Sequence, residues 1–142
     1  MISIAKREEG VSFSIEPYKT IVDIYHHWDG YPEGLGVTLA SYLDDKKVVN
    51  GLSRDDQDVF NGMGCLAASI VAELKDGPGD VYIEPRDSHG WIEYQYYVWG
   101  DDYKDIWISI FDDGDCIFVG KPQKLLDKYG RDQYRRINWN TN

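Results

Sequence analysis

Residues 91–119 alternate between two sets of side chains, and this pattern constrains the fold more than any other feature of the chain. In residues 91–99 one phase carries Trp91, Tyr97 and Trp99 and the other carries Ile92, Tyr94, Tyr96 and Val98. Residues 106–111 alternate isoleucine with Trp107, Ser109 and Phe111. A period of two places successive side chains on opposite faces of a strand. Asp113-Gly114 is a strong hairpin signal before a further strand at residues 116–119. We therefore predict an antiparallel meander.

Weaker patterns predict the other elements. Apolar positions and turn residues favour strands at 11–16, 21–28 and 81–85, and helices at 32–43, 59–74 and 123–129. We predict one α+β domain over residues 1–142, with an antiparallel sheet of five or six strands, two main helices packed on one face and a short C-terminal helix. In this prediction residues 131–142 are a flexible basic tail.

The meander places several large aromatic side chains on one phase of its strands. They are Trp91, Tyr97, Trp99 and Trp107. We expect them to form part of a second, open face of the sheet, which would suit a binding surface. Two alternatives remain open: the helices and the tail cover this face, or a second copy of the chain packs on it in a homodimer.

The formal net charge is −10, and it is unevenly distributed. Residues 121–142 contain six basic and two acidic residues, so the rest of the chain is still more acidic. Such a body repels duplex nucleic acid, whose binding depends on neutralising phosphates. It attracts a basic surface, so a basic protein is the partner that we predict. The alternative is that the charge serves only solubility.

Nothing in the sequence indicates a membrane or secreted protein. No apolar run approaches the roughly 18 residues of a membrane span, and residues 1–10 contain no apolar signal segment. Cys65 and Cys116 lie far apart in apolar surroundings and do not form a disulfide framework. We therefore expect a cytoplasmic protein with reduced thiols.

Residues 25–36 contain the densest group of unusual side chains, where a predicted strand passes into a predicted helix. In one hypothesis this segment binds a ligand or a partner. The candidate residues are Tyr25, His27, Trp28, Asp29, Tyr31 and Glu33. In a catalytic version, Asp29 orients His27 as a general base and Glu33 acts as an acid. In the alternative, the two acids stabilise the turn and the aromatic side chains pack the strand against the helix.

We predict neither a metal site nor a cofactor. His26 and His27 are adjacent, so in a strand they point to opposite faces and do not easily bind one metal. Gly34-Leu35-Gly36 lacks the spacing of a nucleotide-binding loop, and no serine or cysteine stands in a nucleophile motif. A binding protein is therefore a better hypothesis than an enzyme.

Several predicted loops are rich in aspartate. The acidic surface candidates are Asp101, Asp102, Asp105, Asp112 and Asp113. They are either solvated loop residues or, spread across one face, an imitation of phosphate spacing that competes with nucleic acid for a basic groove.

The ten residues from His27 to Gly36, His-Trp-Asp-Gly-Tyr-Pro-Glu-Gly-Leu-Gly, resemble a segment of a group of small, uncharacterised phage and prophage proteins. The same resemblance extends to Trp91–Tyr94 and to the turn at Phe118–Pro122. It implies a bacterial cell during infection or lysogeny, and it carries over no catalytic residue. We therefore predict a small acidic phage-type binding protein that inhibits a host defence or nucleic-acid-processing protein. The alternative is a protein that binds or hydrolyses a nucleotide-like small molecule at residues 25–36.

Overall fold

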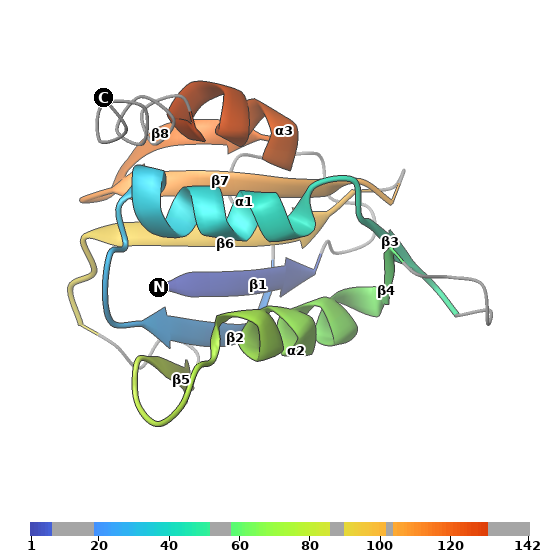
Figure 1. Ribbon diagram of the computed structural model, residues 1–142, viewed down its shortest axis with the longest axis horizontal. Helices are drawn as coiled ribbons and strands as arrows, with labels where there is room; N and C mark the ends of the chain where they lie inside the picture. Colours follow the sequence, from blue (N-terminus) through green and yellow to red (C-terminus); the bar gives the residue numbers. More distant parts are fainter. Residues whose placement is uncertain (7–18, 52–57, 86–89, 102–103, 131–142) are drawn as a thin grey trace, which may run out of the picture.

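A computed structural model describes residues 1–6, 19–51, 58–85, 90–101 and 104–130. Its main sheet has six strands in the order β5-β2-β1-β6-β7-β8 (Figure 1). Neighbouring strands are antiparallel except β1 and β6, which run parallel. The strands are β1 (Ile2–Lys6), β2 (Lys19–His26), β5 (Val81–Glu84), β6 (Tyr94–Gly100), β7 (Ile106–Asp112) and β8 (Asp115–Gly120). The predicted α+β class and the strand number are confirmed.

Three helices accompany the sheet. A π-helical segment, η1 (Pro32–Gly36), leads into α1 (Val37–Leu43), α2 spans Gly62–Leu74, and α3 (Pro122–Leu125) continues into η2 (Leu126–Gly130). Helix α2 contacts β1 and β2, whereas α3 contacts α1, β7 and β8 (Figure 1). A separate pair of short parallel strands, β3 (Lys47–Val49) and β4 (Val59–Asn61), lies between α1 and α2 in the chain.

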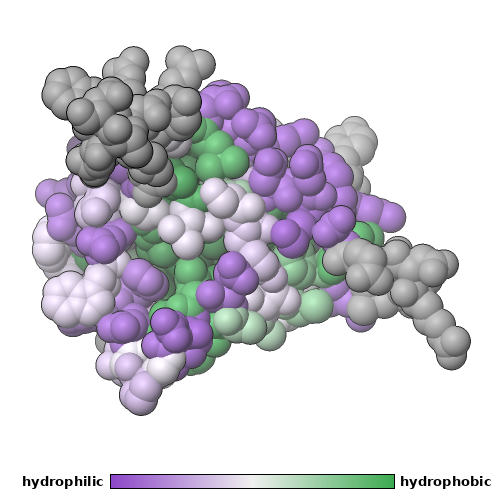
Figure 2. Space-filling view, viewed as in Figure 1, coloured by the Kyte–Doolittle hydropathy of each residue, from purple (hydrophilic) through white to green (hydrophobic). Residues whose placement is uncertain are grey.

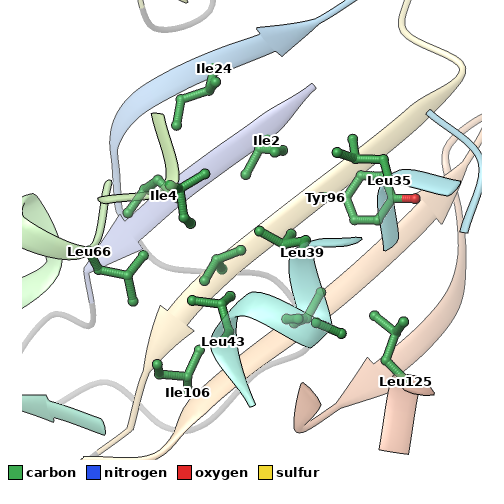
Figure 3. Packing of buried hydrophobic residues seen from close by; sticks show 14 of the residues in the cluster. Ile2, Ile4, Ile24, Leu35, Leu39, Leu43, Leu66, Tyr96, Ile106 and Leu125 are labelled. Atoms are coloured by element: carbon green, nitrogen blue, oxygen red, sulfur yellow. The ribbon is translucent and has the colours of Figure 1, made fainter. Parts of the chain in front are cut away.

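One hydrophobic core joins the helices to a single face of the sheet. The sheet contributes the alternate positions of β1, β6 and β7, including Val98 and Ile108, which are fully buried. Ile2 and Ile4 of β1 are also fully buried (Figure 3). Helices α1 and α2 add their own apolar side chains to the same cluster. Hydrophobic residues remain visible between hydrophilic ones on this helix-bearing side (Figure 2). Burial of each large apolar side chain contributes about 1.5–3 kcal/mol, so the period-two pattern largely determines which face of the sheet packs under the helices.

The first strand of the structure was not predicted. Residues Ile2–Lys6 pair with β2 on one side and with β6 on the other, at the centre of the sheet. The strand predicted at residues 11–16 lies outside the described residues. The strand predicted at 21–28 is β2, displaced by two residues to Lys19–His26.

The second predicted helix begins too early. Residues 59–61 are strand β4, and α2 begins at Gly62. Gly62 has a φ of 81°, a left-handed conformation that a continuous right-handed helix does not contain. The glycine therefore separates a strand from a helix, where the apolar pattern alone predicts one helix.

The prediction of an open aromatic face is wrong at its centre. Tyr97, Trp99 and Trp107 lie on the face opposite the helices, but Trp99 is only 1% exposed and its ring stacks on that of Trp107, 6.5 Å between centroids. Tyr97 meets Phe111 edge to face at 5.6 Å. Trp91 precedes β6 instead of lying in it, and it is 74% exposed. The exposed aromatic surface is therefore at one end of the sheet.

Candidate functional site

The segment after β2 reverses direction through a tight turn. The His27 amide donates to the carbonyl of Asp80 at 2.8 Å, which extends the pairing of β2 with the start of β5. Asp29 then adopts a φ of 53°, which aspartate tolerates better than most residues. Its carbonyl accepts a hydrogen bond at 2.9 Å from the amide of Leu35, which lies within η1. Residues 27–31 therefore project from the end of the sheet as a fixed loop.

Two contacts hold this loop against the core. The Tyr96 hydroxyl donates to the carbonyl of Gly30 at 2.7 Å, from a side chain that is fully buried beside Leu35 (Figure 3). Burial strongly raises the pKa of Tyr96, so its hydroxyl stays protonated as the donor. Gly34 packs so closely that an added Cβ would lie 2.7 Å from the Asp29 carbonyl oxygen. The loop position therefore depends on both residues.

An open pocket of about 470 Å³ lies between this loop and the start of β6. Its lining residues lie at one end of the sheet. At this end β2 finishes and β1 and β6 begin (Figure 1). Two segments far apart in sequence form most of its walls, namely the end of β2 with the following loop, and the residues leading into β6. The lining residues are Met1, Tyr25, His26, His27, Asp29, Gly30, Tyr31, Trp91, Ile92, Glu93 and Tyr94.

Two tryptophans beside the pocket are exposed, yet each is held by a hydrogen bond. Trp28 is 61% exposed and its indole N–H donates to Asp80 at 3.1 Å. Trp91 is 74% exposed and its indole N–H donates to Asp113 at 2.7 Å. An indole held by a hydrogen bond exposes apolar surface to solvent, and it has little conformational entropy left to lose on binding. These side chains are therefore suited to contact another molecule.

The pocket is electrically negative. Asp29 and Glu93 line it, and no lysine or arginine is among its described lining residues. Burial raises the pKa of Tyr94, and the negative charges of Asp112, Glu93 and Glu33 raise it further. Burial also lowers the pKa of the Met1 amine to about 6, and that amine donates to the Tyr94 carbonyl at 3.2 Å. Because an amine with this pKa is mostly neutral at pH 7, it does not cancel the carboxylates.

The two histidines are not arranged as a catalytic pair with an acid. His27 Nδ1 lies 3.3 Å from the Tyr25 hydroxyl, and its ring packs edge to face on Trp28 at 4.4 Å. His26 Nδ1 is buried without a hydrogen-bond partner among the described residues. In the described part of the chain neither imidazole bonds to a carboxylate, so the geometry that orients a general base is missing there.

The structure brings most of the predicted site residues together. Four of them line the pocket, namely Tyr25, His27, Asp29 and Tyr31. Trp28 lies beside the pocket, and the negative charge of Glu33 contributes to the raised pKa of Tyr94. Sequence reasoning placed Trp91 on the predicted aromatic binding face and selected neither Glu93 nor Tyr94 as a site residue, although Trp91–Tyr94 supported the resemblance. Two of the three segments on which the resemblance rests thus meet at one pocket.

The acidic candidates separate into two groups. Asp112 and Asp113 lie at the pocket end of the sheet, where they act on Tyr94 and on Trp91. Asp101 and Asp105 lie at the other ends of β6 and β7, a strand length of about 20 Å away. There Asp105 forms salt bridges with Lys47 and Lys121, the latter at 2.9 Å. Asp102 lies outside the described residues.

Comparison with protein-family models, curated proteins and solved structures found no match to this chain. Within the described ranges, no three His, Cys, Asp or Glu side chains are grouped so that they could hold a metal ion. None of the helices in those ranges is long and apolar enough to span a membrane. The geometry of the pocket is therefore the basis for a functional proposal.

Proposed function

We propose that this protein works by binding a basic protein through the pocket end of its sheet. The observation that carries the proposal is the pair of exposed indoles, Trp28 and Trp91, each tethered to a carboxylate beside an acidic pocket. Aromatic anchors commonly supply most of the binding energy of an interface, and surrounding charges supply orientation and a faster approach. The proposed partner presents a basic surface that covers both indoles.

The setting of this activity comes from the resemblance to phage and prophage proteins. In that setting the protein acts in the bacterial cytoplasm and inhibits a host protein of defence or of nucleic-acid processing. Many such host proteins carry basic grooves for phosphates, and an acidic surface competes for those grooves. The acids at the pocket are more suited to this task than Asp105, because two lysines neutralise Asp105.

A capture experiment tests the proposal. Immobilised wild-type protein and a Trp28→Ala/Trp91→Ala variant are incubated with bacterial lysate, and bound proteins are quantified by mass spectrometry. We expect at least one basic protein to bind the wild type and to be lost from the variant. Retention of the same proteins by the variant would place binding elsewhere. Ile83→Ala, which removes an exposed apolar side chain outside the described lining of the pocket, serves as the matched control.

A second candidate function is the binding of a small molecule, which the pocket volume of about 470 Å³ supports. Pockets for small ligands usually measure about 300–1,000 Å³. The carboxylates of Asp29 and Glu93 disfavour a nucleotide phosphate and favour a neutral or cationic compound. A thermal-shift screen separates the two candidates, because a small ligand raises the melting temperature without a protein partner.

A further inference from the structure

We propose that the pocket receives a single arginine side chain of the partner protein. This inference rests on the proposed function, and it names the chemical group that the site recognises. Three features support it: aromatic side chains in the wall of the pocket, two carboxylates that have no partner in the described part of the chain, and the absence of lysine and arginine from the described lining residues.

The aromatic walls suit a planar cation. Tyr25, Tyr31 and Trp91 line the pocket from the end of β2, the following loop and the approach to β6. The Trp91 indole N–H is bound to Asp113, and with 74% of the residue exposed most of its ring surface is accessible. A guanidinium stacks on such a ring through both its charge and its flat shape, whereas an ammonium offers only the charge.

The carboxylates supply the second half of the recognition. Among the described residues, neither the Asp29 nor the Glu93 side chain has a hydrogen-bond or ion-pair partner. Asp29 lies on the loop held by Tyr96, and the Glu93 carbonyl accepts the amide of Asp113 at 2.8 Å, so both backbones are held in place. A guanidinium has five N–H donors in a fixed fork and binds carboxylates in a bidentate manner.

The field around the pocket favours the same occupant. Glu33 and Asp112 add negative charge near Tyr94, as the raised pKa of Tyr94 indicates. Lys75, beside the start of β5, is engaged with the carbonyls of Gly79 and Val81 at 2.6 and 3.2 Å. An incoming cation therefore meets attraction without a resident lysine to displace.

Short peptides test the inference directly. Acetyl-Gly-Arg-Gly-amide is titrated into ¹⁵N-labelled protein, and the indole N–H resonances are followed after assignment with Trp28→Phe and Trp91→Phe. We expect the Trp91 resonance to shift with a millimolar Kd, as befits one side chain. The citrulline peptide has nearly the same shape without the charge, and we expect it to bind at least about tenfold more weakly, a difference of about 1.4 kcal/mol. The lysine peptide should also bind more weakly, because it cannot stack or bind in a bidentate manner.

Matched variants show whether the two carboxylates are responsible. Asp29→Asn keeps a residue that tolerates the left-handed backbone, and Glu93→Gln keeps the size of the side chain. We expect the double variant to lose arginine binding by about tenfold or more while its melting temperature stays within a few degrees of wild type. Asp58→Asn with Glu73→Gln makes the same charge change at exposed positions outside the pocket and should bind like wild type.

The outcomes distinguish this inference from the proposed function. Equal binding of the arginine and citrulline peptides, or tighter binding of the lysine peptide, would overturn the arginine assignment. If the arginine peptide fails to bind while capture of a partner still depends on Trp28 and Trp91, the proposed function stands and the arginine assignment falls. If both fail, the pocket end of the sheet is not a binding site for a basic protein.

Discussion

At the scale of single residues, Gly34 determines how the loop over the pocket closes. A Cβ at this position would lie 2.7 Å from the Asp29 carbonyl oxygen, a backbone atom with little freedom to move. We predict that Gly34→Ala lowers the free energy of unfolding by about 1–3 kcal/mol, the usual cost of overpacking. Thermal denaturation measures the effect. Gly64→Ala is the control, since nothing lies within 4 Å of its Cβ and alanine favours helix α2. A Gly34 variant as stable as wild type would mean that the loop moves freely.

At the scale of elements, Asp105 joins three segments. Its carboxylate pairs with Lys47 of β3 and with Lys121 before α3, while Asp105 itself precedes β7. The two lysine hydrogen bonds hold the pKa of Asp105 below its usual value of 3.8. A lowered pKa in the folded state stabilises the protein above the unfolded-state pKa, and this contribution is lost as the pH falls through the folded-state pKa. We predict that Asp105→Asn lowers the melting temperature by about 2–4 °C at pH 7. The difference from wild type should shrink below about pH 4, as calorimetry over a pH series would measure. If the difference in melting temperature stays the same at low pH, the stabilisation does not come from the charge of Asp105.

At the scale of the whole molecule, the net charge of −10 governs which partners approach. Salt shortens the Debye length from about 10 Å at 0.1 M to about 3 Å at 1 M, so attraction to a basic partner weakens as salt is added. We predict that the association rate with a hexa-arginine peptide falls severalfold between low and high salt, as stopped-flow tryptophan fluorescence would measure. Duplex DNA should show no binding in a gel-shift assay at physiological salt. An association rate that does not respond to salt would show that charge does not steer the encounter.

The fold class and part of the site follow from local patterns. The period of two in residues 94–99 and 106–111 predicts both strands and the face that packs under the helices, because one phase of the alternation contains Tyr96, Val98 and Ile108. The segment at residues 25–36 stands out by its unusual composition, and four of its six candidate site residues line the pocket. The helix predicted from residue 59 shows the limit of such patterns. The left-handed backbone of Gly62 separates β4 from α2, and the apolar pattern does not reveal this boundary.

By itself, therefore, the sequence determined the α+β class, the face of the meander that packs under the helices and the residues of the loop after β2. These features depend on neighbours in the chain, where periodicity and turn chemistry act. Only the tertiary structure decided that Ile2–Lys6 is a central strand between β2 and β6, and that residues 91–94 meet the loop at residues 27–31. It also placed Asp112 and Asp113 at the pocket and Asp101 and Asp105 far from it. Pairings between distant segments depend on how a whole set of side chains packs at once, and no local pattern records that choice.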